Sequence, residues 1–534
     1  MFSIPNKTKD QGIEAKVQEL RENAKRSARL KYSGFDDRTS IYSQLPRADQ
    51  SFSKITADVE QHEPQKEQLI ATIGEVLAQN HPQLHHFDIT QLNCRSNGYP
   101  ELWRGLATNL VLKEIDLSQV SFPNEPNSTR FLVNPALESL NMTYCSFSDG
   151  TFDSFCRDIQ SSHIKKLRMS ALRLPQNDSW SSLWSALERG ATCLVDLNLV
   201  VSDDDIRSID NGFESFLTNN TTVERIHVRG LDIGRDEFLL FETLSRGLAV
   251  NNNVKILSLW LPPPRRDPAI GQELIQRMFA EGLDRNMTVE SLKLDIIVTA
   301  ETMDALADGL ERMMRNRADA ATRGGHDQEE PLPVLKELEL RCIDAGTRKY
   351  SRTVAGREQF FDRLSRSDVL RVERVKFDLS QSGPLKSSKV YDFIRSTRVT
   401  KSLVLGTFRQ PPRKKKFADF ADALEANNSI SELELGCSWS YTMSDLLFSP
   451  NKYRIRCQCR RNEVQVQTLR KGENLSLLPL VLAGLLSWDD TPTGYVEEDC
   501  EIEARQLVDR TVAYEILKEH PVLFAVSGKR KRED

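Results

Sequence analysis

The chain has 534 residues, of which 39% are hydrophobic and 28% charged, a composition that can bury a large core in water. Its formal net charge of -5 excludes a uniformly basic protein that binds nucleic acid or acidic membranes through its overall field. Nine cysteines spread over this length exclude a small disulfide-rich secreted domain and favour a reduced, intracellular protein.

The sequence offers no targeting or membrane segment that we recognise. Its first residues lack a charged region followed by an apolar stretch, so no secretory signal is expected. The longest apolar stretch, residues 475–486, contains Pro479 and is shorter than the roughly 20 residues that span a bilayer. We interpret it as a buried capping helix. The expected location is therefore the cytoplasm.

Residues 1–65 form a charged segment without a repeat. Ile13, Val17, Leu20 and Ala24 make a thin apolar stripe at helical spacing. We interpret this segment as an arm that is disordered or partly helical. The alternative is a helix that docks on a partner.

A short apolar pattern recurs between residues 66 and 450. It reads apolar, two variable residues, apolar, one variable residue, apolar, and its last two apolar residues have the spacing of a strand with one buried face. The twelve copies begin at Leu84, Leu112, Leu137, Ile164, Leu194, Val223, Val254, Val289, Leu335, Val372, Thr400 and Ile430.

The segments between these strands have helical spacing and end in asparagine. Residues 213–217, 241–248 and 420–424 place apolar side chains three or four positions apart. Asparagines follow at residues 219–220, 251–253, 286 and 427–428. Asparagine tolerates the left-handed backbone that closes a helix. Each repeat is therefore a helix, a turn and a strand, and the stacked repeats predict an α/β solenoid with parallel strands.

The best copy carries a resemblance to a known family. Leu137-Glu-Ser-Leu140-Asn-Met142-Thr-Tyr-Cys145 matches Leu-x-x-Leu-x-Leu-x-x-Asn/Cys. The chain resembles leucine-rich repeat proteins of the ribonuclease-inhibitor-like class over residues 66–450. The resemblance implies a curved horseshoe, with strands on the concave face and helices on the convex face, used mostly to bind proteins. Several repeats are longer than is usual in the family, and residues 323–331 are expected to form a surface loop.

The segment after the last copy is expected to cap the solenoid. Residues 453–459 are predicted to form a final strand, and residues 475–487 and 500–519 capping helices, within a cap at 451–525. The tail, residues 526–534, is predicted to be disordered.

Two basic runs carry an open alternative. Residues 413–416 lie in a predicted loop, and residues 529–532 lie in the tail. Either run is a nuclear import signal or plain solvated charge.

No motif for catalysis or for a cofactor was found. The chain has no phosphate-binding loop, no Gly-x-Gly-x-x-Gly, no His-Glu-x-x-His and no Gly-x-Ser-x-Gly. Cysteines 145, 342, 437, 457 and 459 are assigned to packing. The histidines at positions 81, 85 and 86 are interpreted as a polar cluster at the rim, without a metal. We expect no catalytic residue, no cofactor and no enzyme activity.

The variable residues within the repeat strands should point out of the concave face. Their charges alternate along the chain, which suits a folded protein partner better than a polyanion such as RNA. The expected protein-binding residues are Lys166, Arg168, Arg225, His227, Arg229, Trp260, Glu337, Glu339, Arg374 and Lys376. The alternative is that they are only solvated strand positions that keep the sheet from sticking. Trp260 either anchors a partner or packs on the prolines at 262–264.

The predicted function is a non-catalytic, monomeric scaffold that grips another protein with its concave face, without nucleic acid or membrane. One alternative is a regulator of GTPases, by analogy with a branch of the same repeat class. Another is the recognition arm of a ubiquitin-ligase or immune-receptor assembly. The partner's identity does not follow from the sequence.

Overall fold

The computed structural model describes residues 54–58, 63–80, most of 82–437 except for short loop segments, and a few positions between 455 and 512. The chain divides into two compact units. The first comprises residues 1–259 and 281–288, and the second comprises residues 260–280 and 289–534. None of the described helices is long and apolar enough to cross a membrane.

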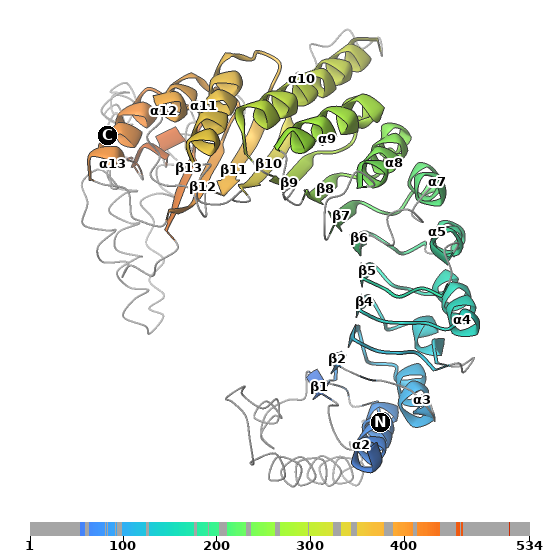
Figure 1. The fold of residues 1–534 in the computed structure, drawn as a ribbon. Coiled ribbons are helices and arrows are strands. Elements are labelled where there is room, and N and C mark those ends of the chain that lie inside the picture. Colours follow the sequence, from blue (N-terminus) through green and yellow to red (C-terminus); the bar gives the residue numbers. More distant parts are fainter. Residues whose placement is uncertain are drawn as a thin grey trace, which may run out of the picture. The chain divides into compact units, whose positions relative to one another are not determined.

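The first unit is a run of parallel strands that follow one another in sequence order. The strands are β1 (Lys54–Asp58), β2 (His86–Thr90), β3 (Glu114–Ser118), β4 (Ser139–Thr143), β5 (Lys166–Ser170), β6 (Asp196–Val201), β7 (Arg225–Gly230) and β8 (Ile256–Trp260). The helical elements are α2 (Glu63–Ala78), α3 (Pro100–Thr108), η2 (Arg130–Val133), α4 (Asp149–Gln160), α5 (Ser179–Gly190), α7 (Asn211–Asn219), α8 (Glu237–Val250) and η3 (Leu283–Arg285). These helices form a second layer on one face of the strands (Figure 1).

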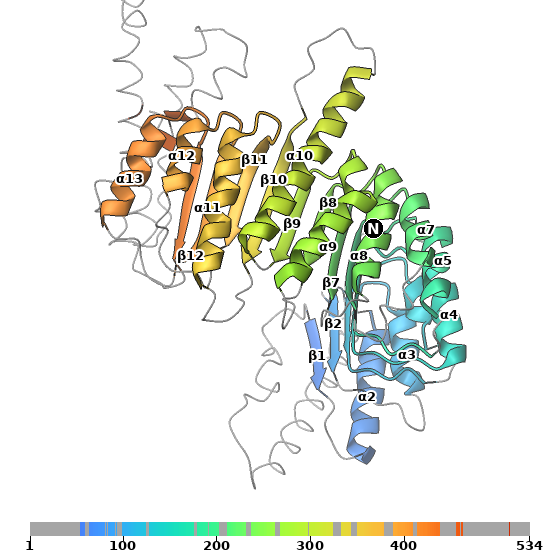
Figure 2. The same cartoon turned by 45° about the horizontal axis from the view of Figure 1, so that its top comes forward.

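The second unit repeats this arrangement. Its strands are β9 (Ser291–Ile296), β10 (Leu335–Cys342), β11 (Val372–Asp378), β12 (Ser402–Phe408) and β13 (Glu432–Cys437), all paired in parallel and in sequence order. Its helices are α9 (Pro268–Glu281), α10 (Ala300–Arg323), α11 (Tyr350–Arg366), α12 (Ser388–Ser396) and α13 (Lys414–Glu425). Figure 2 shows α10 to α13 side by side over the strands.

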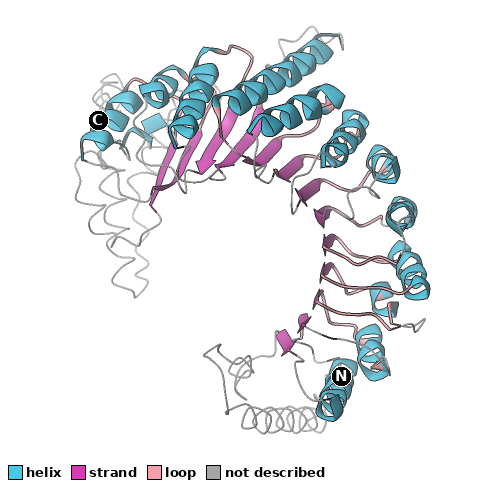
Figure 3. Ribbon diagram, in the orientation of Figure 1, coloured by secondary structure: helices cyan, strands magenta, loops and turns pink. Residues whose placement is uncertain are grey.

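The α/β solenoid predicted from the repeat is confirmed within each unit, where strands and helices form two separate layers (Figure 3). All twelve predicted strands are present, as β2 to β13. The register stacks equivalent apolar residues, so that Leu167, Leu197 and Ile226 lie next to one another on β5, β6 and β7. Each of these side chains is buried. Burial of one apolar face by the next repeat is what holds such a stack together.

Three predictions were wrong: the start of the solenoid, the loop at 413–416 and the final strand at 453–459. The solenoid begins before residue 66, because β1 and the first residues of α2 lie in the segment expected to be an arm. β1 places Ile55 beside Phe87 of β2, although it lacks the full repeat pattern. The basic run 413–416 is not a loop, because α13 begins at Lys414.

The third wrong prediction concerns the final strand at 453–459. The described residues there, 455, 457–459 and 461–462, are helical. Alternation of polar and apolar residues suggested a strand, but Cys459 and Asn462 are buried at helical spacing. Asn462 donates to the backbone oxygens of Asn427 and Ile430 at 3.0 and 2.7 Å, as helix-ending asparagines of earlier repeats do. The predicted capping helices, the tail and the residues before Lys54 lie outside the described residues.

The helix-ending asparagines act through hydrogen bonds and not through a left-handed backbone. Asn109, Asn134 and Asn286 have negative φ angles, and among the described asparagines only Asn80 has a positive one. Each side chain joins its own turn to the preceding repeat. Asn286, for example, donates to the backbone oxygen of Leu248 at 2.7 Å and accepts from the Thr288 amide at 2.9 Å. These bonds satisfy backbone groups that a buried turn would otherwise leave unpaired.

Truncation of Leu197 tests the register of the stack. Its side chain is 0% exposed, and it is the second residue of β6, between β5 and β7. We expect Leu197→Ala to lower the free energy of unfolding by about 2–5 kcal/mol, since it leaves a cavity between two neighbouring repeats. Reversible chemical denaturation measures this loss. A change below about 1 kcal/mol would show that Leu197 does not occupy the core position.

Candidate protein-binding face

The outward positions of the strands make up the candidate site. In β2, β3, β4 and β7 the side chains alternate between buried and more accessible positions, and the accessible ones lie on the face turned away from the helices. We call this the strand face. In the first unit, register brings its residues into three rows across β5, β6 and β7. The rows are Lys166, Asp196 and Arg225; Arg168, Asn198 and His227; and Ser170, Val200 and Arg229.

Five basic residues of these rows form what we call the basic sector: Lys166, Arg168, Arg225, His227 and Arg229. Asp196 lies in the first row between Lys166 and Arg225, and its carboxylate is 3.6 Å from both Arg225 Nη1 and His227 Nε2. Lys166, Arg168 and Arg229 are exposed. Lys166 and Arg168 have no ion-pair partner among the residues that the structure describes, so their charges are available to a ligand.

The strand face of the second unit is arranged differently, around a buried carboxylate. Glu339 of β10 is 2% exposed. Its oxygens lie 2.9 Å from Arg341 Nε, 3.0 Å from Lys376 Nζ and 3.4 Å from Lys293 Nζ. Burial alone would raise the pKa of Glu339, but hydrogen bonds from Lys376 and Arg341 and their charges outweigh it and lower the pKa. Glu339 thus holds three strands together.

The other predicted residues of the second unit also meet opposite charges. Lys293 Nζ lies 3.2 Å from Glu337, which also accepts a hydrogen bond from Ser291 Oγ at 2.8 Å. Arg374 is exposed, with Nη2 3.9 Å from Glu432. Glu337, Glu339 and Lys376 therefore belong to one network of ion pairs in which opposite charges of this unit balance one another. The sequence had assigned these three residues to contacts with a partner.

Trp260 ends β8 and is half-buried. It belongs to the second unit, whereas the basic sector belongs to the first. The prolines at 262–264 lie outside the described residues. Its role as an anchor therefore stays a prediction.

One of the cysteines assigned to packing, Cys145, has a buried thiol. Cys145 is buried and donates to the backbone oxygens of Leu117 and Thr143, and burial raises the pKa of its thiol to about 12. Cys457 and Cys459 lie on a helix and not on the strand predicted at 453–459. The side chains of Cys342 and Cys437 lie outside the described residues.

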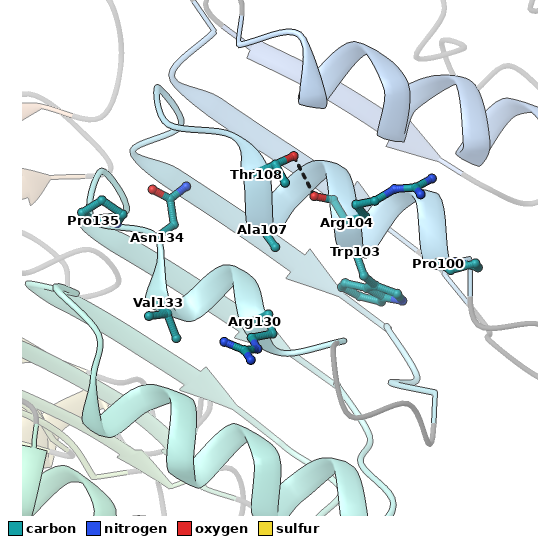
Figure 4. Close-up of a pocket in the computed structure, with 9 residues that line it drawn as sticks. All are labelled: Pro100, Trp103, Arg104, Ala107, Thr108, Arg130, Val133, Asn134 and Pro135. Carbon is teal, nitrogen blue, oxygen red and sulfur yellow. Dashed lines mark hydrogen bonds between the residues drawn. The ribbon is translucent and has the colours of Figure 1, made fainter.

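A hollow of about 620 Å³ lies on the helix side of the first unit (Figure 4). It forms beside α3, where the short helix η2 stands between β3 and β4 in place of a longer helix. It is lined by Pro100, Trp103, Arg104, Ala107, Thr108, Arg130, Val133, Asn134 and Pro135. This lining contains the Thr108 hydroxyl but no carboxylate or imidazole that could act on it as a general base.

One polar cluster of the strand face was missed by sequence reasoning. His86 of β2 lies between two carboxylates of β3, with Nδ1 3.2 Å from Glu114 Oε2 and Nε2 3.0 Å from Asp116 Oδ2. The sequence had grouped His86 with its neighbour His85, which is exposed and has Nδ1 3.4 Å from the backbone oxygen of Val111 instead. Alignment of successive repeats, position by position, would have revealed the cluster.

The sequence matches no protein-family model and no curated protein.

Proposed function

We propose that this chain is a non-catalytic binding protein that holds another protein on its strand face, with the basic sector as a principal contact region. The observation that carries the proposal is the exposure of Lys166 and Arg168 without an ion-pair partner among the described residues. Elsewhere on the strand face, cations such as Lys376 are matched by carboxylates of the same unit. Unmatched cations on a rigid sheet suit the carboxylates of a partner.

A protein suits this surface better than a nucleic acid does. Asp196 interrupts the basic sector, and Glu114 and Asp116 lie on the same strand face on β3, two strands from β5. A polyanion would meet repulsion at these carboxylates, whereas a folded protein can present both signs of charge in register. The resemblance of the repeats to ribonuclease-inhibitor-like leucine-rich repeats adds a fold-level analogy to the same conclusion.

A cytoplasmic location belongs to this proposal. The described cysteines without a disulfide are Cys145, Cys156, Cys193, Cys457 and Cys459. Free thiols in this number fit a reducing compartment.

A charge-reversal variant tests the proposal. The tagged full-length chain captures proteins from extracts of cells that express it, and quantitative mass spectrometry compares the variant Lys166→Glu/Arg168→Glu with the parent. We expect the main partner's affinity to fall by about tenfold to a hundredfold, because two attractive charges become repulsive. The loss should be larger at low salt, where screening is weak.

The matched control is Arg157→Glu/Arg189→Glu. These arginines are exposed on α4 and α5, and their reversal changes the net charge by the same amount. We expect this control to bind like the parent, and all variants to keep the parent's circular dichroism. Equal loss in both double variants, or no loss in Lys166→Glu/Arg168→Glu, contradicts a contact at the basic sector.

A further inference from the structure

We infer that His86, Glu114 and Asp116 form a binding site for a divalent transition-metal ion such as Zn²⁺. One ligand atom from each residue lies within 4.8 Å of the other two. Imidazole nitrogens and carboxylate oxygens both serve as zinc ligands in proteins, and a zinc site with three protein ligands leaves a fourth position for water. The site is independent of the basic sector and of the protein partner proposed for it.

The two strands hold these ligands in place. β2 and β3 are paired in parallel, with His86 directly beside Glu114 and Asp88 beside Asp116. The intervening residues Phe87 and Ile115 are buried, which fixes the backbone beneath the site. Ligands on adjacent strands of a packed sheet are positioned more rigidly than ligands on a loop.

The charge around the cluster favours a cation. On the strand face Asp196 is paired with an arginine, and Glu339 with two lysines and an arginine. Among the side chains that the structure describes, no lysine or arginine forms an ion pair with Glu114 or Asp116, and both share the imidazole of His86. Among the described side chains, these two carboxylates and the one imidazole leave a negative charge that a divalent ion would compensate.

The three ligand atoms could surround a zinc ion after one side chain is adjusted. At a zinc–ligand distance of about 2.1 Å, tetrahedral ligand atoms stand about 3.4 Å apart. Asp116 Oδ2, 3.0 Å from His86 Nε2, is already close to this value, whereas Glu114 Oε2 lies 3.2 Å from the other ring nitrogen, Nδ1. The two carboxylates approach opposite ring nitrogens, so one of them must turn toward the other nitrogen. Glu114, whose side chain is 46% exposed, has the freedom to do so. Water would fill the fourth position.

Titration of the untagged full-length chain with ZnCl₂ tests this site. We expect isothermal titration calorimetry to show one ion bound per chain with micromolar affinity. His86→Ala, Glu114→Gln and Asp116→Asn should each weaken binding by about tenfold or more, because each removes one of three protein ligands. The control His85→Ala changes the neighbouring imidazole and should bind like the parent.

Co²⁺ absorption separates this site from the cysteines. Binding through one nitrogen and oxygen ligands should give visible bands without the intense near-ultraviolet band of a thiolate ligand. Glu114→Gln keeps the size of the side chain, so it decides the question if His86→Ala fails to fold. The inference is overturned if ZnCl₂ does not bind at 100 µM, if folded Glu114→Gln and Asp116→Asn bind like the parent, or if a thiolate band accompanies binding.

Discussion

Asn251→Ala is expected to lower the free energy of unfolding by about 4–6 kcal/mol, a large loss for a single substitution. The buried side chain donates to the backbone oxygens of Leu217 and Asn220 at 2.6 and 3.0 Å. It accepts from the backbone amides of Asn253 and Val254 at 2.8 and 2.9 Å. Alanine would leave four buried or half-buried backbone groups without these partners, each at a cost of about 1–3 kcal/mol. Water and relaxation of the turn recover part of this sum.

The adjacent Asn252 provides the control, because it is exposed. Asn252→Ala should change stability by less than about 0.5 kcal/mol, as surface substitutions usually do. Chemical denaturation followed by circular dichroism measures both variants. If Asn251→Ala were as stable as Asn252→Ala, the asparagine bonds between repeats would not hold the stack together.

Glu339→Gln should lower the free energy of unfolding at neutral pH by about 3–5 kcal/mol. The substitution keeps the size of the side chain but removes the charge that Lys293, Arg341 and Lys376 surround. Lys376 would then lose its carboxylate partner at 3.0 Å, and a neutral amide would face three cations at a buried position. The comparison variant is Glu273→Gln, which alters the half-exposed pair between Glu273 and Arg277 on α9. A surface pair of this kind contributes less than about 1 kcal/mol.

The stability that the Glu339 carboxylate contributes depends on pH, and the direction follows from its lowered pKa. The folded-state pKa of Glu339 is lowered, so its carboxylate contributes stability that is complete above the pKa of the unfolded chain. That contribution is lost as the pH falls through the folded-state pKa. The stability difference between the parent and Glu339→Gln should therefore shrink in acid. A difference that stays constant from pH 7 to pH 3 would show that the charge of Glu339 does not stabilise the fold.

The strands could be predicted because, in each repeat, apolar residues two positions apart mark the buried face of the strand. Leu197 and Leu199 lie two residues apart, as strand alternation requires, and both are buried. The first strand was missed because it lacks the leucine pattern and is defined by its pairing with β2. Residues 455–462 were misread because a short alternation of polar and apolar residues fits either element.

The sequence predicted which charged residues lie on the strand face, but it did not predict which of them contact one another. Lys166 and Arg168 were placed on the face correctly, since that follows from alternation within one strand. The burial of Glu339 depends on Lys293 and Lys376, which come from the two neighbouring strands. Repeats of unequal length hide this register in the sequence. The site of His86 has the same origin, because Asp116 lies 30 residues further along the chain.

Photo-crosslinking from the middle of the basic sector tests the central proposal most directly. Asn198 lies between Arg168 and His227 on the strand face, so a photoreactive residue at this position leaves the basic side chains around it in place. The same residue at position 157, on the exposed side of α4, samples the helix layer. After irradiation of the full-length chain in cell extract, we predict a discrete crosslinked protein from position 198 and not from position 157. Crosslinks to a discrete partner from position 157 alone would contradict the proposal that the strand face holds it.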